Sequence, residues 1–260
     1  MNQHIVKVSC VSYLNSAPFV HGINQHDFSG RLELSLDIPS VCAEKLISGK
    51  ADIGLVPVAA IIDIPNAKRI SKWCIGADGP VKSVTLLSSV PLEKIKTVLL
   101  DFHSVTSVNL IKVLAKFYWK INPVWTEAQS GFEDHIGGAI AGLVIGDRSL
   151  QLQKNYPFVY DLSEEWKKFT GLPFVFACWV SNKNIDQDFL KLFDISLAYG
   201  IKNIQEVVDK LEKEPNFFCG TKSYLMNSLR YEFTEEMKKG MELFLNYKSM
   251  LANSEFKVLQ

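Results

Sequence analysis

The chain has 260 residues, of which 47% are hydrophobic and 22% are charged, a composition typical of a folded globular protein rather than a disordered one. Lys plus Arg and Asp plus Glu both number 28, so the net charge provides no overall field to attract nucleic acid or an acidic membrane surface. We therefore expect neither as a partner. Any anionic ligand must be held by local groups.

The sequence also favours a location in the cytoplasm. The first residues carry His4 and Lys7 among apolar neighbours, without the apolar stretch and cleavage site of a secretory signal. No run approaches the roughly 20 apolar residues that a membrane span needs. The five cysteines are scattered and include no CxxC pair, which favours buried thiols in a reducing compartment over a zinc or redox site.

The first ninety residues alternate short apolar strands with helical patterns, the βαβ rhythm of an α/β protein. The expected strands are residues 5–11, 32–38 and 53–56, and the expected helices are 19–25, 41–48 with Ser40 as N-cap, and 58–62. Two apolar segments then flank the turn residues Ala77-Asp78-Gly79-Pro80. This pattern predicts a hairpin or a crossing pair of strands over residues 73–89.

The second part of the chain continues the alternation and then becomes helical. Further strands are expected at residues 97–100, 142–145, 158–160 and 174–180, and helices at 108–119, 164–169, 186–199, 201–213 and 234–250. Because no low-complexity linker marks a simple boundary, a discontinuous division fits better. We expect a first lobe of residues 1–90 plus 181–260 and a second lobe of residues 91–180.

Three polar loops directly follow apolar strands, where ligands bind in open α/β sheets. The first is residues 12–18, for which simple helix capping is the main alternative to ligand binding. The second is residues 101–107, whose several hydroxyls make an anion pocket as good an interpretation as a helix cap. The third is Gly146-Asp147-Arg148, whose opposite charges can pair with each other or position a loop, and a structural role is favoured over ligand binding.

Signatures of metal and cofactor chemistry are missing from the sequence. The histidines show no HExxH spacing, and GxGxxG, Walker and GxSxG patterns are all absent. We therefore expect no metal and no nucleotide cofactor. His103 lies in a candidate loop, where a role as general base competes with that of a solvated loop residue.

A set of local motifs identifies a resemblance that covers most of the chain. The motifs are VSCVSYLNSAP at residues 8–18, ADIGLVPVA at 51–59, GPVKSVTLLSS at 79–89, SVTS at 104–107, IGD at 145–147 and DLSEEWKKFTGLPFVFACW at 161–179. They closely resemble, in order, the chorismate dehydratases of the futalosine route to menaquinone. The C-terminal helices fit this family less specifically.

The resemblance implies an α/β, two-lobed fold of the type II periplasmic-binding-protein kind, with a ligand cleft between the lobes. It also implies conversion of chorismate to 3-[(1-carboxyvinyl)oxy]benzoate and water without a cofactor. Asn15 would be catalytic, orienting the substrate or polarising the departing hydroxyl. The implied substrate-binding residues are Ser12, Tyr13, Ser83, Ser104, Val105, Thr106, Ser107 and Asp147. His103 and Val105 stand at loop positions that other residues often occupy in relatives.

Other functions remain open from sequence. A binding-only solute receptor and a ligand-sensing module share the implied fold. The 1,4-dihydroxy-6-naphthoate synthase of the same pathway is the nearest enzymatic alternative, although the SYLN segment argues against it. The partner expected is the small-molecule substrate, and a homodimer is compatible with the sequence.

Overall fold

The computed structural model describes residues 5–101, 104–214, 218 and 220–256, with side chains to residue 253. The chain forms two compact units, each built from two segments. Unit 1 comprises Met1–Gly76 and Val175–Thr234, and unit 2 comprises Ala77–Phe174 and Glu235–Gln260. The boundaries fall near residues 76 and 174 instead of 90 and 180. The last segment belongs to unit 2, whereas the sequence placed it in the first lobe.

Unit 1 is built on a mixed sheet whose strands run in the order β11-β4-β10-β3-β1-β2. Strand β1 is parallel to β2 and β3, while β10 is antiparallel to β3 and β11 is antiparallel to β4. The strands are β1 (Val6–Val11), β2 (Leu32–Asp37), β3 (Ile53–Pro57), β4 (Lys68–Ala77), β10 (Phe174–Ser181) and β11 (Arg230–Glu232). The predicted strands at residues 5–11, 32–38, 53–56 and 174–180 are thus confirmed to within two residues.

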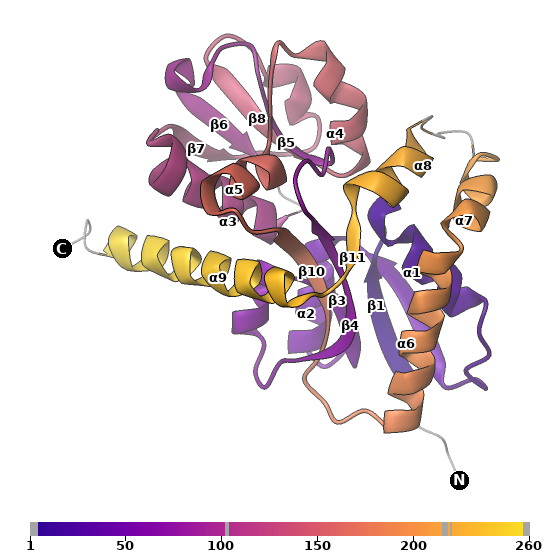
Figure 1. Ribbon diagram of the computed structural model, residues 1–260. Coiled ribbons are helices and arrows are strands. Elements are labelled where there is room, and N and C mark those ends of the chain that lie inside the picture. The colour runs from indigo at the N-terminus through magenta and orange to yellow at the C-terminus, as the bar shows by residue number, and fades with distance from the viewer. Residues whose placement is uncertain (1–4, 102–103, 215–217, 219, 257–260) are drawn as a thin grey trace. The chain divides into compact units, whose positions relative to one another are not determined.

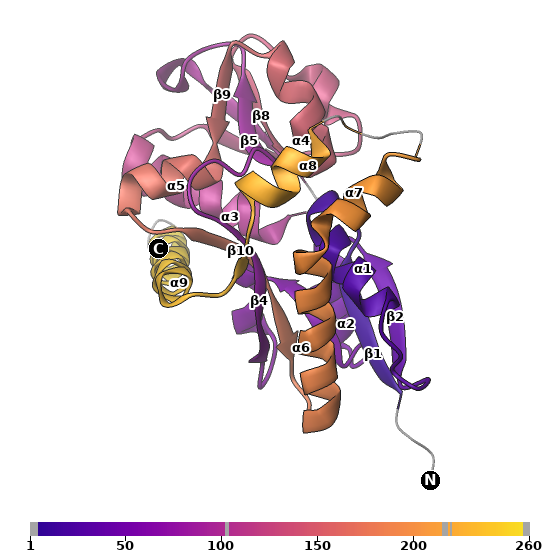
Figure 2. The same cartoon turned by 45° about the vertical axis from the view of Figure 1, so that its right-hand side comes forward.

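Helices cover both faces of this sheet, with α1 and α6 on one face and α2 on the other (Figures 1 and 2). The helices of unit 1 are α1 (Ala17–Asn24), α2 (Pro39–Ile47), α6 (Gln187–Lys202), α7 (Ile204–Leu211) and the short α8 (Thr221–Ser223). Irregular turns η1 (Leu14–Ser16), η2 (Val58–Asp63) and η7 (Tyr224–Ser228) complete it.

Two glycines allow α1 and α6 to approach closely. A Cβ atom added to Gly200 would lie 1.7 Å from the carbonyl oxygen of Pro18, and one added to Gly22 would lie 1.9 Å from the carbonyl oxygen of Ser196. Because backbone meets backbone at both points, no side-chain movement could make room. This contact fixes the position of α1 and therefore of the loop that precedes it.

Unit 2 has its own mixed sheet, in the order β7-β6-β8-β5-β9. Strand β6 is parallel to β7 and β8, and β5 is antiparallel to β8 and β9. The strands are β5 (Val84–Ser88), β6 (Thr97–Leu100), β7 (Val124–Glu127), β8 (Ile140–Ile145) and β9 (Phe158–Asp161). The helices are α3 (Val105–Val113), continued by a π-helical turn η4 (Leu114–Trp119), α4 (Asp147–Leu152), α5 (Leu162–Thr170) and α9 (Glu235–Phe256). Short turns are η3 (Leu92–Lys94), η5 (Phe132–His135) and η6 (Gln153–Asn155).

An aromatic cluster ties α9 to the rest of unit 2. The ring of Phe174 lies 5.5 Å from that of Trp166 and 5.0 Å from that of Phe244 on α9, both edge to face. Trp166 and Phe174 are fully buried, so the cluster contributes both apolar burial and favourable ring geometry. These contacts explain why the C-terminal helix belongs to unit 2.

Two local predictions are wrong. Ser40 is not the N-cap of α2: Ile38 takes that position, because Pro39 can occupy the first helical turn without losing a needed hydrogen bond. The segment 73–89 forms no hairpin, since β4 and β5 belong to different sheets. Both edges of β5 are instead paired, with β8 on one side and β9 on the other.

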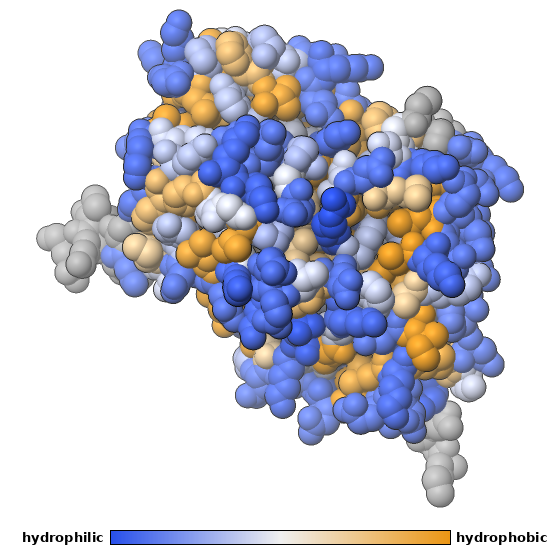
Figure 3. All heavy atoms as spheres, in the orientation of Figure 1, coloured by the Kyte–Doolittle hydropathy of each residue, from blue (hydrophilic) through white to orange (hydrophobic). Residues whose placement is uncertain are grey.

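The surface in view is largely hydrophilic (Figure 3). Hydrophilic residues dominate the face in Figure 3, with apolar residues in scattered groups. Across the part of the chain that the structure describes, no helix combines the length and apolar character needed to cross a membrane.

Candidate functional site

The loop after β1 is a tight turn closed by Ser16. Its hydroxyl donates to the carbonyl oxygen of Val11 and, at 2.7 Å, to that of Tyr13. Ser16 is also the N-cap residue of α1, but its side chain makes no capping bond to that helix. The Ser16 side chain therefore closes the turn and does not cap α1.

Asn15 stands in the middle of this turn with an unusual environment. Its Oδ1 atom is buried and, among the residues that the structure describes, has no hydrogen-bond partner. A buried amide oxygen without a donor costs about 1–3 kcal/mol, so such an atom marks a place where a ligand or water completes the bonding. Six side-chain atoms of the described residues share this state, and Asn15 Oδ1 is the one that lies in a candidate loop.

Ser12 and Tyr13 line a cavity within unit 1 of about 270 Å³. Ser12 is exposed, and its backbone N–H donates to the carbonyl oxygen of Asp37 at 2.9 Å. The opposite wall is formed by α7, which contributes Lys210. Asn15 lies on the same turn but is not among the residues that line this cavity.

Ser83 lies directly before β5 in unit 2 and is only 2% exposed. The residue before it, Lys82, has a left-handed backbone with φ of +66°, which costs a residue with a side chain about 1–2 kcal/mol. Two bonds hold this conformation. The Lys82 N–H donates to Oδ2 of Asp161 at 2.5 Å, and its carbonyl oxygen accepts from the Ser149 hydroxyl at 3.0 Å.

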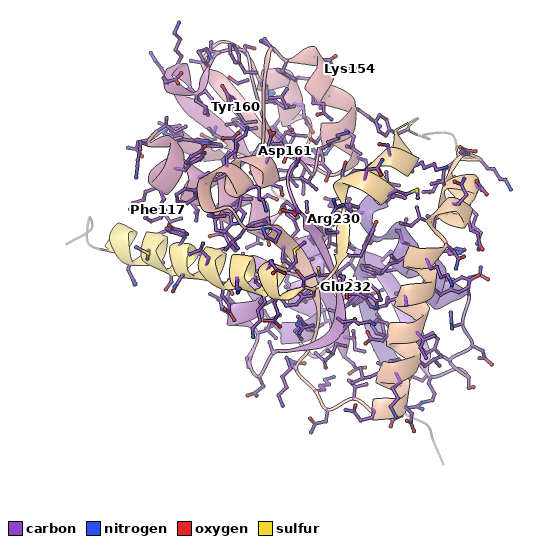
Figure 4. All side chains as sticks on the ribbon, viewed as in Figure 1. Phe117, Lys154, Tyr160, Asp161, Arg230 and Glu232 are labelled. Carbon is purple, nitrogen blue, oxygen red and sulfur yellow. The ribbon has the colours of Figure 1, made fainter. Side chains whose placement is uncertain are left out.

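Each carboxylate oxygen of Asp161 binds a different segment at the junction of β9 and α5, where Figure 4 labels Asp161 beside Tyr160. Its Oδ1 accepts from the backbone N–H groups of Ser163 and Glu164, at 3.0 and 3.1 Å, as the N-cap of α5. Its other oxygen holds the turn before Ser83. Burial raises the pKa of Asp161, and the hydrogen bonds from these N–H groups oppose that effect without overcoming it.

Ser104 is the N-cap of α3. Its hydroxyl oxygen accepts from the Ser107 N–H at 3.1 Å and donates to the Ser107 hydroxyl at 2.8 Å. Val105, Thr106 and Ser107 therefore form the first helical turn rather than a loop, and the helix begins three residues earlier than predicted. Thr106 and Ser107 are buried, while Val105 is 36% exposed. His103 lies outside the described residues.

Asp147 is the first residue of α4 and is exposed. Its neighbour Arg148 forms ion pairs with Asp101 and Glu133. The structural interpretation of Arg148 thus agrees with these contacts. Asp101, at the end of β6, also accepts from the backbone N–H of Ile145 at 3.4 Å.

Within unit 2 these residues gather at one edge of the sheet. The carbonyl oxygen of Ser83 accepts from the Gly146 N–H at 2.8 Å, so Ser83 and Asp147 come from adjacent chain segments. Leu100 pairs with Leu143 in parallel register, which puts the segment leading to α3 beside the one leading to α4. Unit 2 thus brings Ser83, Asp147 and the start of α3 to the same edge, whereas Asn15, Ser12 and Tyr13 belong to unit 1.

Some residues that shape these loops were missed from sequence. Arg148 was recognised, but its partner Glu133 was not, because the two are separated by fifteen positions in a loop of unremarkable composition. Asp161 carried a usable signal: Asp161 followed three residues later by Glu164 is the pattern of a helix N-terminus.

Across the described residues, no cluster of three or more His, Cys, Asp or Glu side chains could hold a metal ion. The four described cysteines are all buried, and burial raises the pKa of the Cys42 thiol to about 11 and that of Cys178 to about 12. Such thiols are poor ligands and poor nucleophiles. Cys219 lies outside the described residues.

Comparison with known proteins gives this geometry a context. The sequence profile described as "Menaquinone biosynthesis" matches residues 6–249. The chain belongs to the menaquinone biosynthesis family. It is also 24% identical over 255 residues to a chorismate dehydratase from Thermus thermophilus, covering 89% of this chain and 91% of that protein.

Solved structures confirm the predicted fold of this family member. A protein from Archaeoglobus fulgidus has a TM-score of 0.72 at 13% identity, covering 98% of this chain and 99% of that one. The aliphatic sulphonate binding protein of Escherichia coli has a TM-score of 0.63 at 12% identity, with coverages of 97% and 93%. A Candida albicans protein described as having the generic periplasmic binding protein fold scores 0.64 at 11% identity, covering 92% and 90%. The α/β, periplasmic-binding-protein-like architecture is thus established.

Proposed function

We propose that the protein is a chorismate dehydratase, converting chorismate to 3-[(1-carboxyvinyl)oxy]benzoate and water in the futalosine route to menaquinone. The observation that carries the proposal is Asn15, whose buried amide oxygen awaits a donor within a motif of this family. The similarity to the Thermus thermophilus enzyme over most of both chains supports the same reaction.

The chemistry requires removal of a ring proton and loss of the neighbouring hydroxyl group, and aromatisation provides the driving force. Donors that face the ring carboxylate would stabilise the enolate-like charge that develops as the proton leaves. Hydroxyl groups suit this role, and the hydroxyls of Ser83, Thr106 and Ser107 are candidates for it. The Ser104 hydroxyl holds this turn instead, because its proton is donated to the Ser107 hydroxyl. The enolpyruvyl carboxylate of the substrate is the proton acceptor in this proposal.

Asn15 would contact the departing hydroxyl. Its Oδ1 accepts a hydrogen bond from the hydroxyl, which orients the C–O bond for cleavage, and its NH2 group can donate to a neighbouring substrate oxygen. The ring proton taken up by the enolpyruvyl carboxylate then passes to the leaving hydroxyl, which departs as water. Asn15→Ala removes both interactions, and the expected loss in kcat is roughly 100-fold, the scale seen when one group that stabilises a transition state is deleted. Asn15→Asp keeps the acceptor and loses the donor, which separates the two contributions.

The matched control is Asn227→Ala, an exposed asparagine of unit 1 whose amide bonds only to Ser223 among the described residues. Turnover is followed by ultraviolet absorbance and product mass. Activity of Asn15→Ala within threefold of the wild type would refute the role of Asn15.

A binding-only function is the second candidate, because solved structures of this fold include binding proteins. The same incubation separates the two. Chorismate that binds, seen by calorimetry, but persists unchanged would favour the binding protein.

A further inference from the structure

The cavity in unit 1 has a composition suited to one class of ligand. Its apolar wall comprises Val11, Ala17, Val20, Leu36, Val207 and Leu211. Polar groups are contributed by Ser12 and Tyr13 from the loop after β1, and a cation by Lys210 from α7. At about 270 Å³, the volume lies near the lower end of ligand pockets, roughly 300–1,000 Å³. A small ring acid matches these walls in size, polarity and charge.

Lys210 is held in place by a short chain of hydrogen bonds. Its Nζ lies 3.1 Å from Nδ1 of His21, and Nε2 of His21 lies 3.1 Å from Oε2 of Glu206. An ammonium group can only donate, so Nδ1 of His21 accepts the hydrogen bond from Lys210. Nε2 of His21 then carries the ring proton and donates a hydrogen bond to Glu206. His21 is only 7% exposed, and the ring is therefore fixed between α1 and α7.

This arrangement leaves Lys210 able to bind an anion. An ammonium has three N–H donors, and the bond to His21 uses one of them. No second partner engages its Nζ within the described part of the chain.

We propose that this cavity is a carboxylate subsite, in which Lys210 binds one carboxylate of a small ring acid while His21 and Glu206 position Lys210. The identity of that acid as chorismate rests on the proposed function. The carboxylate subsite itself does not. It supplies what the loop residues of the dehydratase motif lack, because none of Ser12, Tyr13, Asn15 or Ser83 carries a positive charge that could offset the two carboxylates of chorismate.

The first experiment measures binding by calorimetry with benzoate as the probe and benzamide as its uncharged counterpart. Lys210→Met should weaken benzoate binding about tenfold, because the hydrogen bond lost is charge-assisted even though Lys210 is exposed. It should leave benzamide binding unchanged. Lys210→Arg should retain benzoate binding to within about threefold. Lys191→Met, which removes an exposed lysine from α6, should change neither ligand.

The second experiment tests the positioning role. His21→Gln should weaken benzoate binding in the wild-type background and have no further effect in the Lys210→Met background, because the two residues act as a unit. A merely structural role for His21 would weaken binding equally in both. With chorismate, Lys210→Met should raise KM about tenfold and leave kcat within about twofold, as expected for loss of a binding contact.

The failures can be told apart. If the wild type does not bind benzoate, or if Lys210→Met binds it as the wild type does, the carboxylate subsite is refuted. If benzoate binding depends on Lys210 but chorismate is not dehydrated, the subsite stands and the proposed reaction is wrong.

Discussion

Replacing Asp161 should affect two parts of unit 2 at once. Asp161→Ala removes the N-cap of α5, at a cost of about 1 kcal/mol, and the charge-assisted bond to the Lys82 N–H, at about 1.5–3 kcal/mol. Relaxation of the left-handed Lys82 backbone returns about 1 kcal/mol. We expect a net loss of about 1.5–3 kcal/mol in the free energy of unfolding, measured by urea titration with tryptophan fluorescence and circular dichroism.

The control is Asp186→Ala, because Asp186 is also an N-cap aspartate, with a 3.3 Å bond from the Phe189 N–H of α6. Asp186 also pairs with Arg31 at 3.0 Å, but an exposed ion pair contributes little to stability. Because Asp186 is exposed and holds no strained turn, its loss should be clearly smaller. Lys82→Gly should stabilise the protein when Asp161 is present, because glycine adopts positive φ without strain. Equal losses for Asp161→Ala and Asp186→Ala would refute the reasoning.

Three further predictions concern packing, acid stability and thiol reactivity. Gly200→Ala should destabilise unit 1 by more than about 2 kcal/mol in urea titration, since its methyl group would collide with the Pro18 carbonyl oxygen; unchanged stability would contradict the close contact of α1 and α6. Burial acts to raise the pKa of Asp37, but hydrogen bonds from Lys45 and two serines outweigh burial, and the net shift of the pKa is downward. The ionised Asp37 therefore stabilises the folded protein above the unfolded-state pKa, and this stabilisation is lost as the pH falls through the folded-state pKa. Asp37→Asn should flatten the fall of the free energy of unfolding below about pH 4. A Cys219→Ser variant keeps four buried cysteines, Cys10, Cys42, Cys74 and Cys178. A thiol reagent should label none of them in the native protein and all of them after denaturation. Rapid labelling of the native protein would show that burial does not protect them.

Much of the fold was accessible from sequence because strand signals are local. Residues 97–100 were predicted and found at the same bounds, and the apolar run ending at Val11 gave β1 to within one residue. What failed depends on distant partners. The segment 73–89 has the turn residues of a hairpin, yet β5 pairs with β8 and β9, which lie more than fifty residues further along the chain.

The candidate site shows the same division. The loops of Asn15 and Ser104 were predicted because polar residues there directly follow apolar strands in the sequence, whereas Ser83 was found only through the family resemblance. The support of these loops was not visible. His21 and Lys210 are separated by 189 positions, and the left-handed backbone of Lys82 has no signal in the side chain at that position.

Incubation of the purified protein with chorismate, without added metal or cofactor, tests the central claim most directly. Mass spectrometry should detect one product that has lost a single water molecule, formed in amounts well above the protein concentration, together with the absorbance of a new aromatic ring. Chorismate recovered intact after prolonged incubation with folded protein would contradict the account.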